Sequence, residues 1–99
     1  DQELLIPFKA RAFLDLSARK EKGERVKNGD IKKHQRDVFR LSQLLREDES
    51  IDISAVIKQD LEKFLVQVES DAKLDPKNFG VQLSLEEAIA LLRSVYQIS

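Results

Sequence analysis

The residues of this sequence that could bind a charged partner are mostly cations in its first half. Residues 1–46 carry 12 Lys and Arg against 7 Asp and Glu, whereas residues 47–99 carry 5 against 11. On a helix, Lys32, Arg36 and Arg40 would form one ridge, because they recur every four residues. Such a ridge can follow a phosphate backbone, since each cation neutralises a phosphate and releases a counterion.

Two features of the sequence weaken that interpretation. No aromatic residue is interleaved on the ridge, although aromatic side chains are what stacks single-stranded bases. The basic and acidic halves can also simply attract each other within one fold. Asp37 lies among the cations, four residues after Lys33, and an ion pair on an exposed helix face is its ordinary role.

Several classes of catalytic site have no support in the sequence. Cysteine is absent, so disulfides and cysteine-based metal sites are excluded, and His34 is the only histidine. The chain has no GxGxxG, no GxxxxGK[ST], no HExxH and no GxSxG motif. His34 falls on the apolar side of its predicted helix, where a boundary histidine normally holds a hydrogen bond. We therefore expect no complete active site and no metal ligands in this chain.

The composition predicts one small all-α domain, a compact bundle of about four helices spanning residues 1–99. Only three Gly and two Pro occur among 99 residues, which disfavours turn-rich β architecture. No apolar run approaches the roughly 20 residues needed to span a bilayer, and no targeting peptide is visible, so we expect a cytoplasmic protein without membrane contact. The chain opens with Asp1 rather than Met, and we expect it to be part of a longer protein.

The 3.6-residue periodicity predicts the helices that must position these residues. Their expected spans are about Leu4 to Lys22, about Ile31 to Arg46 with Asp30 as N-cap, from Asp52 or Ser54 to near Lys73, and from the capping box of Ser84 and Glu87 to about Ile98. Gly23 is a natural stop for the first of them.

The expected core faces follow from the same periodicity. In the first helix the predicted apolar stripe is Leu5, Phe8, Ala12 and Leu16, with Phe13 alongside. Other apolar residues lie off the predicted faces and would be partly exposed, namely Leu4, Leu14, Phe39, Val66 and Leu91. Exposed apolar side chains of this kind often mark an interface with a partner.

Two segments of the first half carry a resemblance to a known family. Residues 6–16 read Ile-Pro-Phe-Lys-Ala-Arg-Ala-Phe-Leu-Asp-Leu, and residues 32–41, after a basic connector, read Lys-Lys-His-Gln-Arg-Asp-Val-Phe-Arg-Leu. Together they resemble the AbiEii-type nucleotidyltransferases of bacterial abortive-infection and toxin–antitoxin systems. Lys9 matches the helix lysine of that family, and Asp37 with Leu41 matches its Lys-x-x-Asp-hydrophobic-x-x-Leu helix. The resemblance covers about the first 45 residues.

The resemblance implies a C-terminal helical domain that is inactive alone. The family's catalytic sheet, with its Gly-Gly or Gly-Ser segment and paired acidic residues, has no counterpart in this chain. An N-terminal catalytic domain of the same protein would hold Mg²⁺ and a nucleoside triphosphate. Lys9 and Arg36 would supply positive charge to a phosphate in the cleft between the domains, with Asp37 beside them. RNA or an antitoxin protein is a further partner that the resemblance allows.

Two alternatives to this interpretation stay open from the residues alone. The chain could be an autonomous helical module that binds protein or nucleic acid through its basic N-terminal hairpin. It could also be a structural lid whose off-face apolar residues are covered by a partner domain.

Overall fold

The computed structural model describes residues 1–99 and contains helices but no strand. In chain order the elements are α1 (Gln2–Glu21), α2 (Asn28–Ser42), α3 (Ala55–Glu69), the short 3-10 helix η1 (Pro76–Phe79) and α4 (Leu85–Val95). The predicted fold class, a compact all-α bundle of about four helices, is confirmed. None of these helices combines the length and the apolar character that crossing a membrane would require.

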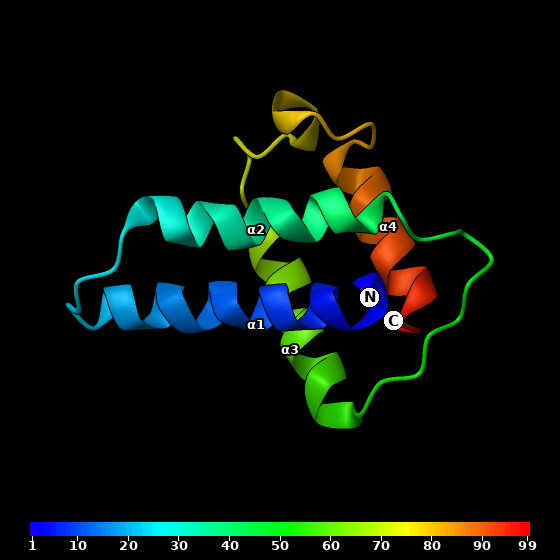
Figure 1. Cartoon of the computed structure of the whole chain (residues 1–99), viewed down its shortest axis with the longest axis horizontal. Helices are drawn as coiled ribbons and strands as arrows, with labels where there is room; N and C mark the ends of the chain where they lie inside the picture. Colours follow the sequence, from blue (N-terminus) through cyan, green and yellow to red (C-terminus); the bar gives the residue numbers. More distant parts are fainter.

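The helices are arranged as a hairpin with a second layer behind it. Figure 1 shows α1 and α2 side by side and antiparallel, with α3 crossing behind them at a steep angle. The last helix, α4, lies near the C-terminal end of α2, while η1 sits beyond the outer side of α2. The hairpin therefore has one face packed on α3 and another face that α3 does not cover.

Aromatic side chains join the hairpin to α3 at the centre of the core. The Phe13 and Phe64 rings meet edge to face with centroids 5.3 Å apart, and the Phe39 ring lies 6.0 Å from Phe64. Phe39 and Phe64 are fully buried. Because edge-to-face and tilted aromatic pairs add to the gain from burial, Phe64 holds both hairpin helices to α3.

Local signals set most of the helix ends. The capping box at the start of α4 is confirmed, since the Ser84 hydroxyl accepts a hydrogen bond from the Glu87 N–H and the Glu87 carboxylate accepts one from the Ser84 N–H. Gly23 follows the end of α1 with a φ of 89°, which only glycine adopts without strain. The predicted N-cap Asp30 is wrong: α2 begins at Asn28, so Asp30 lies in the first turn, where its charge suits the helix dipole.

The predicted apolar stripe of the first helix is partly wrong. Phe8 and Leu5 are 67% and 42% exposed, and the core side of α1 is formed instead by Ile6, Ala10 and Phe13. The apolar residues of α1 occur on every side of the helix, so the 3.6-residue periodicity alone does not select one face as the core side. Among the residues expected off the predicted faces, Leu4 and Val66 are exposed, but Phe39 is fully buried.

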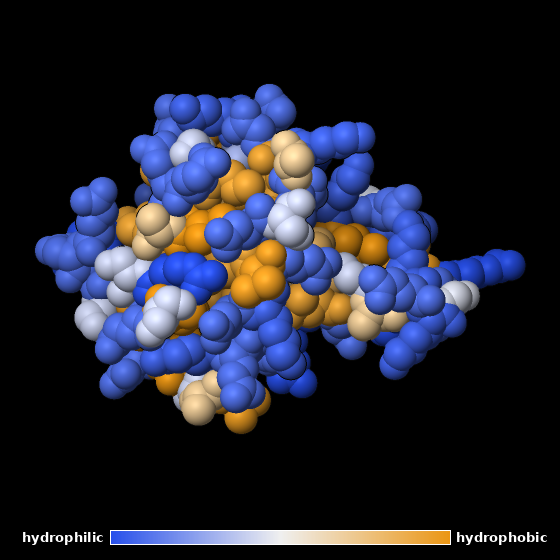
Figure 2. All heavy atoms as spheres, turned by 180° about the vertical axis from the view of Figure 1, so that it is seen from behind, coloured by the Kyte–Doolittle hydropathy of each residue, from blue (hydrophilic) through white to orange (hydrophobic).

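The face turned away from the viewer in Figure 1 is not a continuous apolar surface. Figure 2 shows apolar atoms near its middle, over the region of α3 and α4, with polar atoms bordering them on every side. Scattered apolar exposure of this kind is normal for a small domain.

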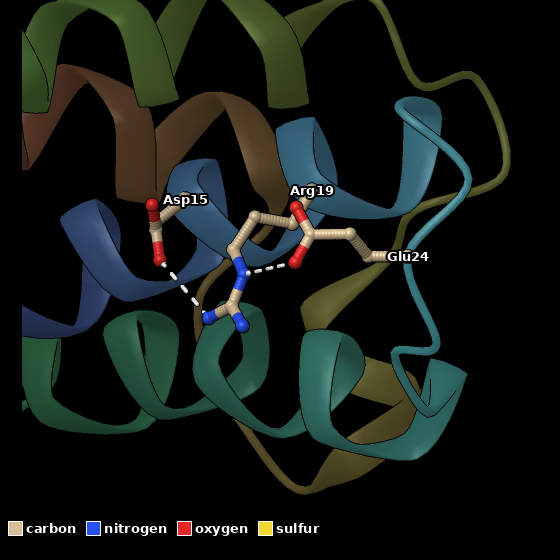
Figure 3. A network of polar contacts seen from close by, with 3 residues as sticks. All are labelled: Asp15, Arg19 and Glu24. Carbon is tan, nitrogen blue, oxygen red and sulfur yellow. Dashed lines mark hydrogen bonds and ion pairs between the residues drawn. The ribbon is translucent and has the colours of Figure 1, made fainter.

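The two ends of α1 are held in different ways. At its start, the Tyr96 hydroxyl donates a hydrogen bond of 2.8 Å to the Glu3 carbonyl, which ties the C-terminal segment to the first turn. At its end, Arg19 pairs with Asp15 at 3.7 Å and with Glu24 of the connector at 3.2 Å (Figure 3). The first contact is partly buried and the second is half exposed, so the first contributes more to stability.

Candidate functional site

The structure brings together two of the three predicted site residues. Lys9 lies on α1 and Asp37 on α2, and the antiparallel hairpin places the Lys9 Nζ 3.1 Å from an Asp37 carboxylate oxygen. The two side chains are only 23% and 21% exposed. Their ion pair is therefore better shielded from solvent than an ordinary surface pair, and its geometry is correspondingly better defined.

Asp37 also binds a second cation on its own helix. The other carboxylate oxygen of Asp37 lies 3.5 Å from Arg40 Nη1, one turn further along α2. The predicted neighbour Lys33 makes no ion pair with it. Two cations thus share one carboxylate, so the cluster of Lys9, Asp37 and Arg40 carries one net positive charge.

The Lys9 ammonium keeps free hydrogen-bonding capacity. A lysine ammonium has three N–H donors, and the contact with Asp37 is its one polar contact in the structure. Asp37 fixes where this ammonium sits, while the remaining donors stay available to an anion. This arrangement can bind a phosphate oxygen at a defined position.

Arg36, the third predicted site residue, is not part of this cluster. Its guanidinium lies over the Phe79 ring, 5.1 Å from the centroid, and the Arg40 guanidinium lies 5.6 Å from the same centroid. Arg40 therefore touches both groups, because it pairs with Asp37 and also contacts Phe79. Lys9, Asp37, Arg40 and Arg36, the last two joined through the Phe79 ring, form one connected strip across the hairpin, which we call the charged strip.

Phe79 is a site residue that the sequence interpretation missed. The ridge on α2 has no interleaved aromatic residue of its own, but η1 brings one to it from a distant part of the chain. The Asp75 side chain caps η1 by accepting a hydrogen bond from the Lys77 N–H, and Pro76 starts its first turn. These local signals predict a turn at this place, but nothing in them indicates that the turn packs on α2.

His34 does not make the hydrogen bond expected of it. The residue is partly buried on α2, and its Nδ1 atom is buried without any hydrogen-bond partner. The chain has no Cys that His34 could activate as a nucleophile, and no hydroxyl group hydrogen-bonds to its Nδ1 atom.

The acidic residues of the hairpin do not gather into a cluster, and those nearest the predicted motifs are paired with cations. No three His, Asp or Glu side chains lie close enough together to hold a metal ion. Asp37 and Asp15, the acidic residues on the hairpin nearest the predicted motifs, are each paired with arginine or lysine.

Comparison of the chain with models of known families, with curated proteins and with solved structures gives no match.

Proposed function

We propose that this chain is the helical part of an AbiEii-like nucleotidyltransferase, in which Lys9 contacts a phosphate of the bound nucleotide. The observation that carries the proposal is the shielded ion pair between Lys9 and Asp37. The resemblance to that family assigns both residues to its motifs, and they lie on different helices. Their contact at 3.1 Å brings these two motif residues next to each other across the hairpin.

The chemistry of nucleotidyl transfer gives such a lysine a role. An acceptor hydroxyl attacks the α-phosphorus of a nucleoside triphosphate, pyrophosphate leaves, and the hydroxyl proton passes to a base. Negative charge on the phosphate oxygens must be stabilised throughout, and a fixed ammonium does this without reorganising at the moment of reaction. Asp37 would act as a positioning residue, because it holds Lys9 without contacting the nucleotide itself.

The proposed reaction needs groups that this chain does not supply. Mg²⁺ and the nucleoside triphosphate would be bound by an N-terminal catalytic domain, since two-metal chemistry requires convergent carboxylates. The helical domain would close the cleft from one side and would be inactive alone. Lys9 is accessible for this role because α3 pairs with a different part of α1, through Arg11 and Asp60 at 3.7 Å.

The test is a transfer assay on the protein that contains both domains, with a nucleoside triphosphate labelled at the α-phosphate. We expect Lys9→Ala to lower the rate by about 10² to 10³, the usual cost of losing one preorganised donor in a transition state. Asp37→Asn should lower it less, because Lys9 stays charged but loses its fixed position. Lys63→Ala, which removes an exposed lysine on α3, serves as the matched control.

The assay separates a functional role from a structural one. Circular dichroism of the Lys9→Ala variant should show unchanged helix content, since the pair contributes at most about 1 kcal/mol to folding. A Lys9→Ala protein that transfers nucleotide at the wild-type rate would refute the proposed role of this lysine.

A further inference from the structure

We propose that the outer side of α2, together with η1, binds a single-stranded polynucleotide. The surface has three parts. Lys32, Arg36 and Arg40 form what we call the arginine ridge, the Phe79 ring lies beneath the two arginines, and a hollow lies beside the ridge. This inference goes beyond the proposed nucleotidyl transfer and does not depend on it, because Arg40 is the only residue that this surface shares with the cluster of Lys9, Asp37 and Arg40.

Phe79 gives the two arginines a fixed base. Its ring is partly buried and packs at 6.2 Å from the ring of Phe39, which is itself fully buried. The guanidinium groups of Arg36 and Arg40 lie over this anchored ring. A guanidinium held on an aromatic ring loses less conformational entropy on binding, and it keeps its N–H donors for phosphate and a planar face for stacking a base.

The hollow beside the ridge has the groups that a nucleotide needs. Its volume is about 220 Å³. Its polar lining consists of Lys32, Gln35, Arg36, Asp71, Lys73, Asp75 and Asn78. The cations can bind phosphate, while the two amide side chains can hydrogen-bond the edges of a base.

The hollow is lined by more cations than carboxylates, and its cations make no ion pair within the protein. Arg36, Lys32 and Lys73 make no ion pair in the structure, in contrast to the paired arginines at positions 11, 19, 40, 46 and 93. The two acidic side chains are already engaged with the backbone. Asp71 accepts a hydrogen bond from the Lys73 N–H and Asp75 accepts one from the Lys77 N–H, both at 3.1 Å. Both carboxylates keep their charge, so the three cations and two anions that line the hollow leave one net positive charge, which favours an anionic ligand.

The same features favour a single strand over the other polyanions. A hollow of about 220 Å³ is below the usual size of a small-molecule pocket, so it suits one base or phosphate group of a longer ligand. A base can enter it only when it is unpaired. An acidic peptide would use the cations but would leave the amides and the stacking faces of the arginines without a role.

The experiment measures fluorescence anisotropy of labelled single-stranded RNA and DNA oligonucleotides of one sequence, titrated with the 99-residue chain over a range of salt concentrations. We expect affinity to fall as salt rises. Arg36→Gln should weaken binding about tenfold and reduce the salt slope by about 0.7, the value for one phosphate contact of a single strand. Arg36→Lys should keep the slope but bind about threefold more weakly, because lysine keeps the charge and loses the planar contact with Phe79.

Lys63→Gln is the matched control, because it removes one exposed charge on α3, outside the arginine ridge, and should leave affinity within about twofold of wild type. Binding of either oligonucleotide in this pattern supports the proposal, and tighter binding of RNA would in addition indicate a contact with the 2′-hydroxyl. The proposal is overturned if Arg36→Gln and Phe79→Leu both bind as wild type does. It is also overturned if a polyglutamate peptide or a duplex competes as well as the single strand. Because the titration contains no nucleoside triphosphate or metal, its outcome is separate from that of the transfer assay.

Discussion

The charged strip on the hairpin and the joint between the C-terminal segment and α1 are built on opposite principles. In the joint, Tyr96 is fully buried, donates to the Glu3 carbonyl and lies next to Val95, whose carbonyl accepts a 2.8 Å hydrogen bond from the Ile51 N–H. In the strip, Lys9, Arg40 and Arg36 keep part of their surface in solvent and have donors left over.

The difference separates stability from binding. Neutral hydrogen bonds inside a core are costly to break, because a buried group is left without a partner. Partly exposed ion pairs contribute little to folding, since solvent replaces the lost contact. Variants in the joint should therefore lower the free energy of unfolding, while variants in the strip should leave it nearly unchanged and alter only what the protein binds.

The largest effect is expected at the aromatic core beneath the hairpin. Phe64 packs against Phe13 and Phe39, and Phe39 in turn carries the Phe79 ring of the strip. We expect Phe64→Ala to lower the free energy of unfolding by about 3–5 kcal/mol, the cost of a large cavity in a core. Urea unfolding followed by circular dichroism measures it. Val66→Ala on the same helix, 57% exposed, should change it by less than about 0.5 kcal/mol.

The joint should respond next, and its response should depend on pH. Tyr96→Phe removes the hydrogen bond to Glu3, which we expect to cost about 1 kcal/mol of unfolding free energy at neutral pH. Burial raises the pKa of Tyr96 above its ordinary value of 10.0, and the nearby Glu3 and Glu49 carboxylates raise it further. The folded protein therefore resists losing this proton, while the unfolded chain loses it readily.

The direction of the pH effect follows from linkage. A raised pKa in the folded state stabilises the protein fully below pH 10, and this stabilisation is lost as the pH rises above the pKa of the unfolded chain. The free energy of unfolding of the wild type should thus fall above pH 10. The Tyr96→Phe variant has no phenol to ionise, so this fall should be absent from it. Because Tyr96 is the only tyrosine, phenolate absorbance follows it directly. If the phenol of Tyr96 titrated in the folded protein with its ordinary pKa of 10.0, the buried position of this side chain would be contradicted.

A double-mutant cycle tests how little the strip contributes to folding. We expect the coupling free energy between Lys9 and Asp37 to be about 0.5–1 kcal/mol. It is obtained from the free energies of unfolding of the wild type, Lys9→Ala, Asp37→Ala and the double variant. Arg19 and Glu24 (Figure 3), whose side chains are 49% and 50% exposed, are the comparison pair and should couple more weakly. A Lys9–Asp37 coupling above about 3 kcal/mol would mean that the pair is structural, and the contrast between the two regions would be lost.

The smallest effect is expected at the start of α4, outside both regions. The hydrogen bond from the Ser84 N–H lowers the pKa of the Glu87 carboxyl below its ordinary value of 4.5, and the Ser84 side chain lowers it further. The stabilisation from the ionised carboxylate is therefore present at neutral pH and is lost as the pH falls through that lowered pKa. Glu87→Gln should lower the melting temperature at pH 7 but not in strong acid. Glu86→Gln, in the same first turn without a capping contact, should change it less at pH 7.

Some local features of this chain were predictable from its sequence, although the start of α2 was not, and the tertiary features were harder to predict. The capping box at Ser84 and the stop at Gly23 depend on neighbours within a few residues, so both are visible in the sequence. The core face of α1 is not, because its apolar residues lie on every side and only the position of α3 decides which are buried.

The candidate site divides in the same way. The resemblance singled out Lys9 and Asp37, but their contact depends on the register of the hairpin. Phe79 could not be associated with Arg36 from the sequence, because that contact requires η1 to fold back on α2.

The hydrogen bond between Tyr96 and Glu3 joins residues 93 positions apart. Chains are synthesised from the N-terminus, so α1 leaves the ribosome long before this partner exists. Until residue 96 emerges, the first turn of α1 has no anchor at its carbonyl, and the hairpin with its cations is already exposed to the cell. This contact of the domain can therefore form only after nearly all of its 99 residues have been synthesised.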